Sequence, residues 1–215
     1  MNYDVGRLLL EASRDPFHAV RGLAIQSHAS LEQSLCSLLA TFGDIREDVA
    51  SVIFFKISNA RARDDILEKL LKKKYGEKHA VFWHSVKILN GQVTQVRNEI
   101  VHWNVVNCVG DNGQELRLMP PAFWDVNPNS PYKTIADLND FRVKCGFMGR
   151  LCNMFRFFLM PDRPPVWTPE QLQTWTDIFR QAVAYPPPDT HPLCQTTTAP
   201  ELQPPSSVES QPPQS

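Results

Sequence analysis

Apolar residues recur along this chain at the spacing of helices, in long stretches separated by turn signals. From Pro16, which suits a first helical turn, apolar positions follow a period near 3.6 residues as far as Phe42, and Gly43 supplies a stop. A second helix is predicted over residues 47–75. Its first half is apolar almost all round and should be buried on several sides, whereas its lysine- and arginine-rich second half should be half solvated.

A third helical pattern begins near Lys78 and meets Asn90-Gly91, a pair that favours a turn. Because glycine costs about 1 kcal/mol relative to alanine inside a helix, the pattern predicts a kink or a break at this pair. Residues 92–103 would then form a separately oriented segment. The period next changes to that of strands, and a Gly-Asp-Asn-Gly turn signal predicts a β-hairpin over about residues 104–119.

Two further helices carry clear start signals. Thr134, with Asp137 three residues later, is typical of a helix N-cap followed by an acidic group in the first turn. The sequence Thr168-Pro169-Glu170-Gln171 has a capping threonine, a proline at the first helical position and a glutamine at the third. The last helix should follow from it, with apolar residues on one face as far as Val183. The whole pattern predicts a mainly α protein with one inserted hairpin.

Composition and charge add predictions about the number of domains, the C-terminal tail and the binding of charged partners. The chain has 215 residues and 42% apolar residues, which predicts one compact domain over residues 1–185. Proline, serine, threonine and glutamine dominate residues 186–215, so a disordered tail is expected there. The formal net charge of -1 gives no overall attraction to nucleic acid or membranes, so any such contact must be local.

The cysteine pattern and the apolar clusters bear on the compartment. The five cysteines form no Cys-x-x-Cys pair, which disfavours a disulfide framework and a structural zinc site. No signal-peptide pattern opens the chain, and no apolar cluster approaches the roughly 20 residues that a membrane span needs. We therefore expect a cytoplasmic protein with free thiols, no membrane association, and no metal or other cofactor.

Candidate chemistry concentrates in the segment Arg97-Asn98-Glu99-Ile100-Val101-His102. Asn98 and His102 are four apart and share one helix face. Arg97 and His102 are separated by about 140 degrees on an ideal helix, so they converge only if the helix bends or ends near His102, or if the arginine reaches round. An arginine fork matches phosphate oxygens, and an imidazole gives or takes a proton near neutrality. Together with an orienting asparagine, they suit cleavage of a phosphodiester without a metal.

The alternative interpretation is structural, because three fixed residues recur by chance in many helices. The alternating charges around Arg61 and Arg63 are typical of a solvated face, although they would also suit an RNA groove. Trp103 is either a stacking surface for a base or an aromatic residue that closes the helix. Glu32 on the first helix either faces the motif as a hydrogen-bond partner or is solvated, and solvation is the slightly preferred interpretation.

A long helix pair followed by Arg-Asn-x-x-x-His resembles the HEPN superfamily, the nucleotide-binding domains of higher eukaryotes and prokaryotes. Arg97, Asn98 and His102 match its signature, residues 55–67 are similar to an arginine-bearing helix of bacterial members, and the Glu32 region is similar to their first helix. The resemblance covers about residues 17–103 and implies an antiparallel helical bundle that dimerises. It also implies a metal-independent endoribonuclease of a toxin–antitoxin or defence system, with a cognate antitoxin as a further partner.

On this resemblance, His102 would act as general base or acid, Arg97 would hold the phosphate and stabilise its transition-state charge, and Asn98 would position one of them. The product of 2′-hydroxyl attack would be a 2′,3′-cyclic phosphate. Some toxin members carry a tyrosine two residues after the histidine, where this chain has Asn104. Other members are non-catalytic modules that bind a nucleotide, RNA or a protein, and this alternative stays open at the level of sequence.

Overall fold

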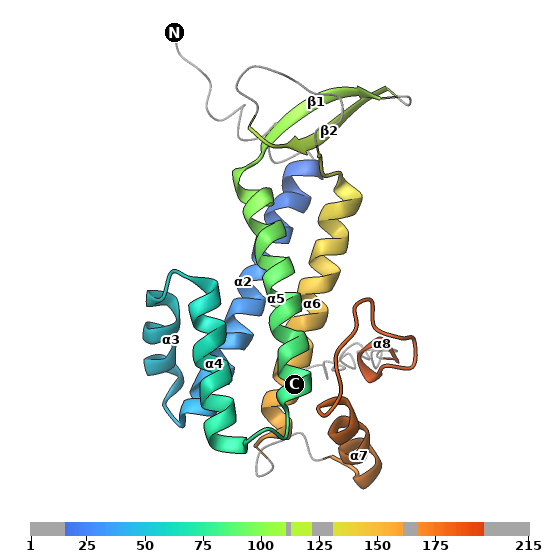
Figure 1. Ribbon diagram of the computed structural model, residues 1–215. Coiled ribbons are helices and arrows are strands. Elements are labelled where there is room, and N and C mark those ends of the chain that lie inside the picture. Colours follow the sequence, from blue (N-terminus) through green and yellow to red (C-terminus); the bar gives the residue numbers. More distant parts are fainter. Residues whose placement is uncertain (1–15, 111–112, 122–130, 161–166, 196–215) are drawn as a thin grey trace, which may run out of the picture.

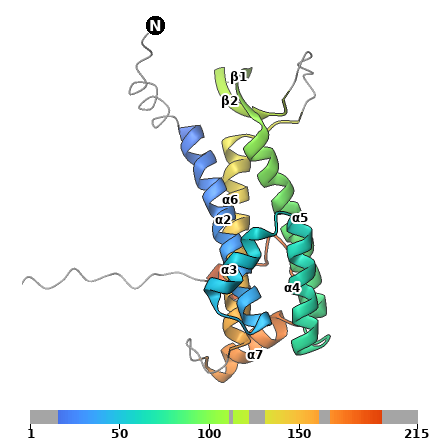
Figure 2. The ribbon, with the colours of Figure 1, turned by 90° about the vertical axis from the view of Figure 1, so that its left-hand side faces the viewer.

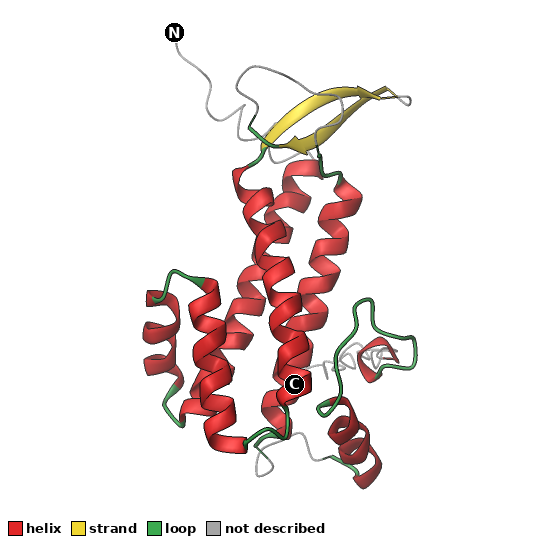
Figure 3. Cartoon of the chain, in the orientation of Figure 1, coloured by secondary structure: helices red, strands yellow, loops and turns green. Residues whose placement is uncertain are grey.

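The computed structural model describes residues 16–110, 113–121, 131–160 and 167–195, and they form a mainly helical protein (Figure 1). Figure 3 separates the helices from the one pair of strands. In chain order the elements are α2 (Pro16–Gly43), α3 (Glu47–Lys56), α4 (Ala60–Tyr75), α5 (Ala80–His102), β1 (Asn104–Gly110), β2 (Gly113–Met119), α6 (Ile135–Phe158), α7 (Pro169–Ile178) and α8 (Pro192–Gln195). None of the described helices has the length and apolar character needed to cross a membrane.

Three long helices, α2, α5 and α6, run alongside one another and hold most of the core (Figure 1). Each contributes an apolar stripe at helical spacing, as the periodicity predicts. Leu38 from α2, Phe82 from α5 and Phe155 from α6 are completely or almost completely buried. Phe155 contacts Phe82 with ring centroids 4.7 Å apart and Phe42 with centroids 6.1 Å apart, so aromatic packing joins all three helices.

The predicted helix over residues 47–75 is in fact two helices, and this corrects the sequence interpretation. Ile57 is extended, and the Asn59 side chain accepts a hydrogen bond of 3.2 Å from the Ala62 N–H, which starts α4 anew. The expectation of burial on several sides was also wrong. α3 stands outside α2 beside α4 (Figure 2) and buries only Ala50 and Phe54.

α5 passes through Asn90-Gly91 without interruption, so the predicted break at this pair was wrong. The Asn90 side chain is buried, and its amide group donates to both carboxylate oxygens of Asp64, at 2.9 and 3.1 Å. A partner on α4 therefore stabilises asparagine inside the helix. Helix propensity, which depends on the local sequence, does not include such a contact. The helix ends at His102, where Trp103 turns extended.

The predicted hairpin is confirmed as an antiparallel pair of strands at one end of the bundle (Figure 1). Its register runs from Asn104 opposite Met119 to Gly110 opposite Gly113, while the turn residues 111–112 lie outside the described residues. Leu118 is fully buried, and its backbone exchanges two hydrogen bonds of 2.9 Å with Lys133. These contacts fix the hairpin close to the end of α5.

Both predicted start signals after the hairpin are confirmed as capping boxes, Thr134 with Asp137 for α6 and Thr168 with Gln171 for α7. α7 ends at Ile178, earlier than the apolar pattern suggested. The chain then continues as an ordered loop into α8, and Leu193 packs against the core. Residues 186–195 of the predicted tail are thus part of the packed structure, and residues 196–215 lie outside the described residues.

Candidate functional site

The end of α5 carries the three residues that the sequence singled out. Asn98 and His102 are exposed on one face, and Arg97 is half-buried beside them. An Arg97 Nη1–H donates to the Asn98 side-chain oxygen at 3.2 Å. Among the described contacts, no hydrogen bond joins Arg97 to His102 and no carboxylate lies within ion-pair distance of Arg97. Of the conditions that would let the two side chains converge, the structure provides a helix that ends at His102.

Arg21 of α2 fixes this helix end from outside. Its Nε donates to the Ile100 carbonyl at 2.9 Å, and its Nη2 donates to the carbonyls of Val101 at 3.1 Å and Trp103 at 3.2 Å. The last carbonyls of a helix lack partners within it and carry partial negative charge, so a guanidinium satisfies both needs. The sequence did not identify Arg21, because its partners lie about eighty residues further along the chain.

Trp103 closes the helix rather than standing free. It is half-buried against the core, and its backbone N–H donates to the Glu99 carbonyl at 2.9 Å. The Lys133 ammonium lies 5.4 Å from the centre of the indole ring and forms an ion pair of 2.7 Å with Glu99. Lysine therefore already lies over the ring, which favours the helix-closing interpretation of Trp103 over the base-stacking one.

A cluster of partly buried charged residues lies where α2 meets α4. Glu32 of α2 accepts a hydrogen bond of 2.6 Å from Arg63 of α4, and these side chains are 22% and 14% exposed. The other Glu32 oxygen lies 3.7 Å from Nδ1 of His28, which is buried one helical turn earlier. The Arg63 guanidinium also covers the Phe54 ring at 4.7 Å from its centre. The pair thus joins α2, α3 and α4 through polar and aromatic contacts.

The interior pair of Asp64 and Asn90 extends this cluster to α5. Together with His28 and Glu32, they line a cavity of about 10 Å³, large enough for about one water molecule. Burial raises the pKa of Asp64, while the hydrogen bond from Asn90 and the charge of Lys87 oppose that rise. Polar groups from all three helices therefore meet in one nearly filled interior space.

Electrostatics connects Arg97 with this cluster through His28. Burial lowers the pKa of His28, Glu32 opposes that change, and the positive charges of Arg97 and Arg63 lower the pKa further. His28 also stacks on Phe141, with ring centroids 6.4 Å apart and planes 11° from parallel. The imidazole is thus kept neutral at neutral pH, so it adds no further positive charge near the two guanidinium groups.

The remaining sequence candidates separate into two environments. Arg61 is exposed, as expected for a residue that contacts a substrate, but Arg63 turns inward, which does not fit its predicted substrate contact. Glu32 pairs with Arg63 and His28 instead of with the Arg97 motif, so neither a direct contact with the motif nor full solvation describes it. The structure thus brings Glu32 and Arg63 together, whereas Asn98 and His102 are exposed on α5 with Arg97 half-buried beside them.

The surface group has a defined chemical capacity. Arg97 offers donors that match phosphate oxygens, and His102 presents an exposed imidazole, a type of side chain that serves as a general acid or base. Among the described residues, no group of three or more His, Cys, Asp or Glu is arranged to hold a metal ion. Comparison with protein-family models, curated proteins and solved structures found no match to this chain.

Proposed function

We propose that this chain is a metal-independent endoribonuclease of the HEPN type, with a composite site formed by the α5 ends of two copies. The observation that carries the proposal is the exposure of Asn98 and His102 on one face, beside an arginine that no described carboxylate neutralises. A purely structural role would place the charged groups inside and satisfy them there, as happens for Arg63. A guanidinium that pairs with no carboxylate among the described residues, beside an exposed imidazole, is instead suited to a phosphate ligand.

The proposed reaction needs only these groups and the RNA. The imidazole of one His102 takes the proton of a ribose 2′-hydroxyl, and the 2′-oxygen forms a bond to the adjacent phosphorus. The bond from phosphorus to the 5′-oxygen breaks, and the leaving oxygen takes a proton from the protonated His102 of the second copy. The products are a 2′,3′-cyclic phosphate and a 5′-hydroxyl. Arg97 binds the non-bridging oxygens and stabilises their added charge, and Asn98 orients its guanidinium.

A regular exposed stripe on α5 supports pairing with a second copy. Seven of the exposed positions along the helix follow one another in alternating steps of three and four, the spacing of the contact positions in a two-stranded coiled coil. They are Val81, His84, Ile88, Gly91, Gln95, Asn98 and His102, which we call the α5 stripe. Val81 is 57% exposed and Ile88 is 51% exposed, and apolar side chains this exposed gain from being covered. Gly91 has open space where a Cβ would lie, so a second backbone can approach closely.

The relative direction of the two α5 helices decides whether the pair forms a composite site. In a parallel pair, each position of the α5 stripe lies opposite the same position of the second copy. His102 then approaches His102, and the two Arg97 residues flank them. In an antiparallel pair centred on Gly91, His102 would lie opposite Val81, far from the second motif. We therefore assign the parallel arrangement to the active dimer, in the cytoplasm, where RNA is available and thiols stay reduced.

The test is cleavage of RNA by the purified full-length chain in the presence of EDTA. We expect cleavage that leaves cyclic phosphate ends, with His102→Ala and Arg97→Ala each lowering the rate about 10²- to 10⁴-fold. Arg150→Ala removes an exposed arginine from α6 and serves as the matched control, with an unchanged rate. Intact RNA across varied sequences, or equal rates for all four proteins, would contradict the proposal.

A second candidate is a non-catalytic module that binds RNA or a nucleotide. The observation in its favour is that, within one chain, Arg97 contacts Asn98 rather than His102. This alternative predicts that the protein retains labelled RNA in a binding assay, that Arg97→Ala weakens the retention, and that no cyclic phosphate ends form. The same samples therefore separate the two candidates.

A further inference from the structure

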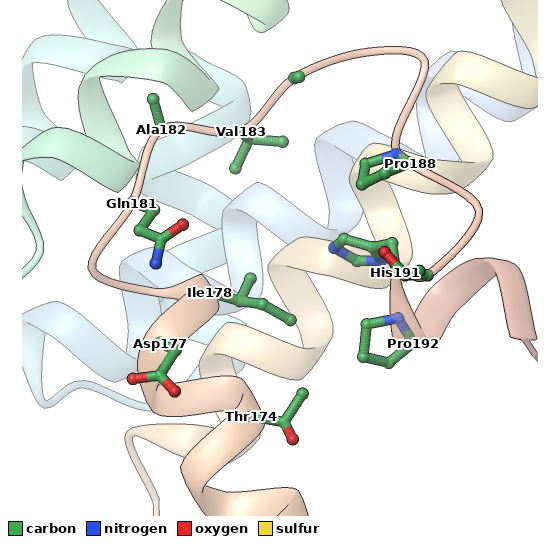
Figure 4. A pocket seen from close by; sticks show the side chains of 11 residues that line it. Thr174, Asp177, Ile178, Gln181, Ala182, Val183, Pro188, His191 and Pro192 are labelled. Atoms are coloured by element: carbon green, nitrogen blue, oxygen red, sulfur yellow. The ribbon is translucent and has the colours of Figure 1, made fainter.

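A cavity of about 440 Å³, lined by residues between 174 and 192, lies between α7 and the loop that leads to α8 (Figure 4). Its volume falls within the roughly 300–1,000 Å³ of small-molecule sites in proteins. It shares no element with the α5 end and has no part in the proposed cleavage. The walls are mainly apolar, with Ile178, Val183, Pro188 and Pro192 around the space.

Aromatic contacts hold one wall in place. The ring of His191 packs edge-on against Phe147 and Trp175, with centroids 5.4 and 6.1 Å apart. Its Nδ1 accepts a hydrogen bond of 3.1 Å from the Leu193 N–H, which leaves the proton of the neutral ring on Nε2. Burial lowers the pKa of His191, so the ring stays neutral at neutral pH. This wall therefore contributes no charge.

Among the described residues that line the cavity, Asp177 alone carries a formal charge. In Figure 4 its carboxylate lies on one side of the space, with Ile178 in the middle and His191 on the opposite side. One Asp177 oxygen accepts a hydrogen bond of 3.0 Å from Gln173, and among the described residues no lysine or arginine forms an ion pair with it. Within the described part of the chain, the cavity thus combines an apolar interior with one negative charge that no lysine or arginine pairs with.

We propose that this cavity binds a small organic cation with an apolar body. The apolar body lies among Ile178, Val183 and Pro188, where it removes apolar surface from water. The ammonium group lies beside Asp177 and supplies the missing positive charge. Charge complementarity selects an amine over a carboxylate of the same size, because a second negative charge beside Asp177 is repelled.

The test uses 2-phenylethylamine as the probe and phenylacetate, an anion of similar size, as its matched counterpart. Binding to the full-length chain is followed by amide chemical shifts of residues 174–192 and by tryptophan fluorescence. We expect saturable binding of the amine, and binding at least about fivefold weaker for phenylacetate. Asp177→Asn should weaken binding of the amine by about fivefold, whereas Glu170→Gln, which removes an exposed charge of α7 outside the cavity, should not change it.

A second variant, Ala182→Phe, fills the cavity from an exposed position and leaves Asp177 intact. It should abolish the shifts caused by the amine while the remaining amide spectrum stays that of the folded chain. The proposal fails if the amine shows no saturable binding, if phenylacetate binds equally well, or if Asp177→Asn and Ala182→Phe both bind the amine as the unaltered chain does.

Discussion

Arg61 and Arg63 show how differently the fold uses two like residues that are close in sequence. Both lie in the first turn of α4. Side chains two positions apart in a helix point in widely different directions. Arg61 is exposed, whereas Arg63 lies inside with a bond of 2.6 Å to Glu32. Removing one member of a largely buried ion pair leaves the other charge without compensation. The two arginines should therefore differ sharply in their effect on stability.

We expect Arg63→Met to lower the free energy of unfolding by about 3 kcal/mol, because Glu32 would stay largely buried with only His28 beside it. Arg61→Met, the matched control, should change the free energy of unfolding by less than about 0.5 kcal/mol. Urea denaturation followed by circular dichroism measures both. Equal changes for the two variants would show that the Glu32–Arg63 bond contributes nothing particular to the fold.

Among single residues, the sequence points to Arg97, Asn98 and His102 as a candidate group, which stays a prediction, and it gives Glu32 and Arg63 other roles than the pairing that the structure shows. Arg97, Asn98 and His102 could be found because their spacing along one helix is itself the signal. The bonds of Arg63 with Glu32, of Asn90 with Asp64 and of Arg21 with the end of α5 join residues from different helices. Such pairs depend on how the helices pack, and the spacing of residues along the chain does not predict this packing.

α3 is the element for which apolar content most misleads. Its sequence is apolar almost all round, yet Val52 is 72% exposed and Phe55 is 51% exposed, while Phe54 between them is only 2% exposed. The reason lies in α3 packing against α2 with one narrow side. Apolar residues are common on protein surfaces, so an apolar helix need not be a central one.

The two sides of α3 should respond in opposite ways to substitution. Val52→Asp should change the free energy of unfolding by less than about 0.5 kcal/mol, because the side chain is already in water. Phe54→Ala should cost about 3–5 kcal/mol, because it leaves a cavity beside Arg63 and the core. Thermal or urea unfolding compares the two. A large loss of stability for Val52→Asp would instead support the burial on several sides that the sequence alone suggested.

Most elements follow from local signals, and the exceptions have one cause. The starts of α6 and α7 are set by Thr134 and Thr168, whose capping partners lie three residues away in the sequence. The hairpin likewise follows from alternation and a turn signal. The break before α4 and the unbroken passage of α5 through Asn90-Gly91 were mispredicted, because there a cap and a distant carboxylate outweigh propensity.

For the molecule as a whole, the α5 stripe makes a prediction about how two copies pair. In a background with Cys108→Ser and Cys194→Ser, the two cysteines that are not buried, Asn98→Cys should form a disulfide with the same position of a second copy under mild oxidation. The parallel pair brings these positions face to face, within the roughly 7 Å between Cα atoms that a disulfide allows. Electrophoresis without reducing agent measures the dimer.

Two controls accompany the cross-linking experiment with Asn98→Cys. Arg150→Cys, at an exposed position of α6, reports random collision and should give little dimer. An antiparallel pair centred on Gly91 would instead place His84 opposite Asn98, so it would cross-link a mixture of His84→Cys and Asn98→Cys but neither variant alone. That result would rule out a composite site on α5 while leaving the fold unchanged.

The bond between Arg21 and the end of α5 also has a consequence for the order of assembly. Ile100, whose carbonyl accepts from Arg21, is synthesised 79 residues after Arg21. Contacts so distant in sequence form slowly, because a long loop must close before they contribute. In a growing chain, α5 can therefore form before its last carbonyls have Arg21 as a hydrogen-bond partner. The end of α5 near His102 reaches its final structure only when α2 packs against it.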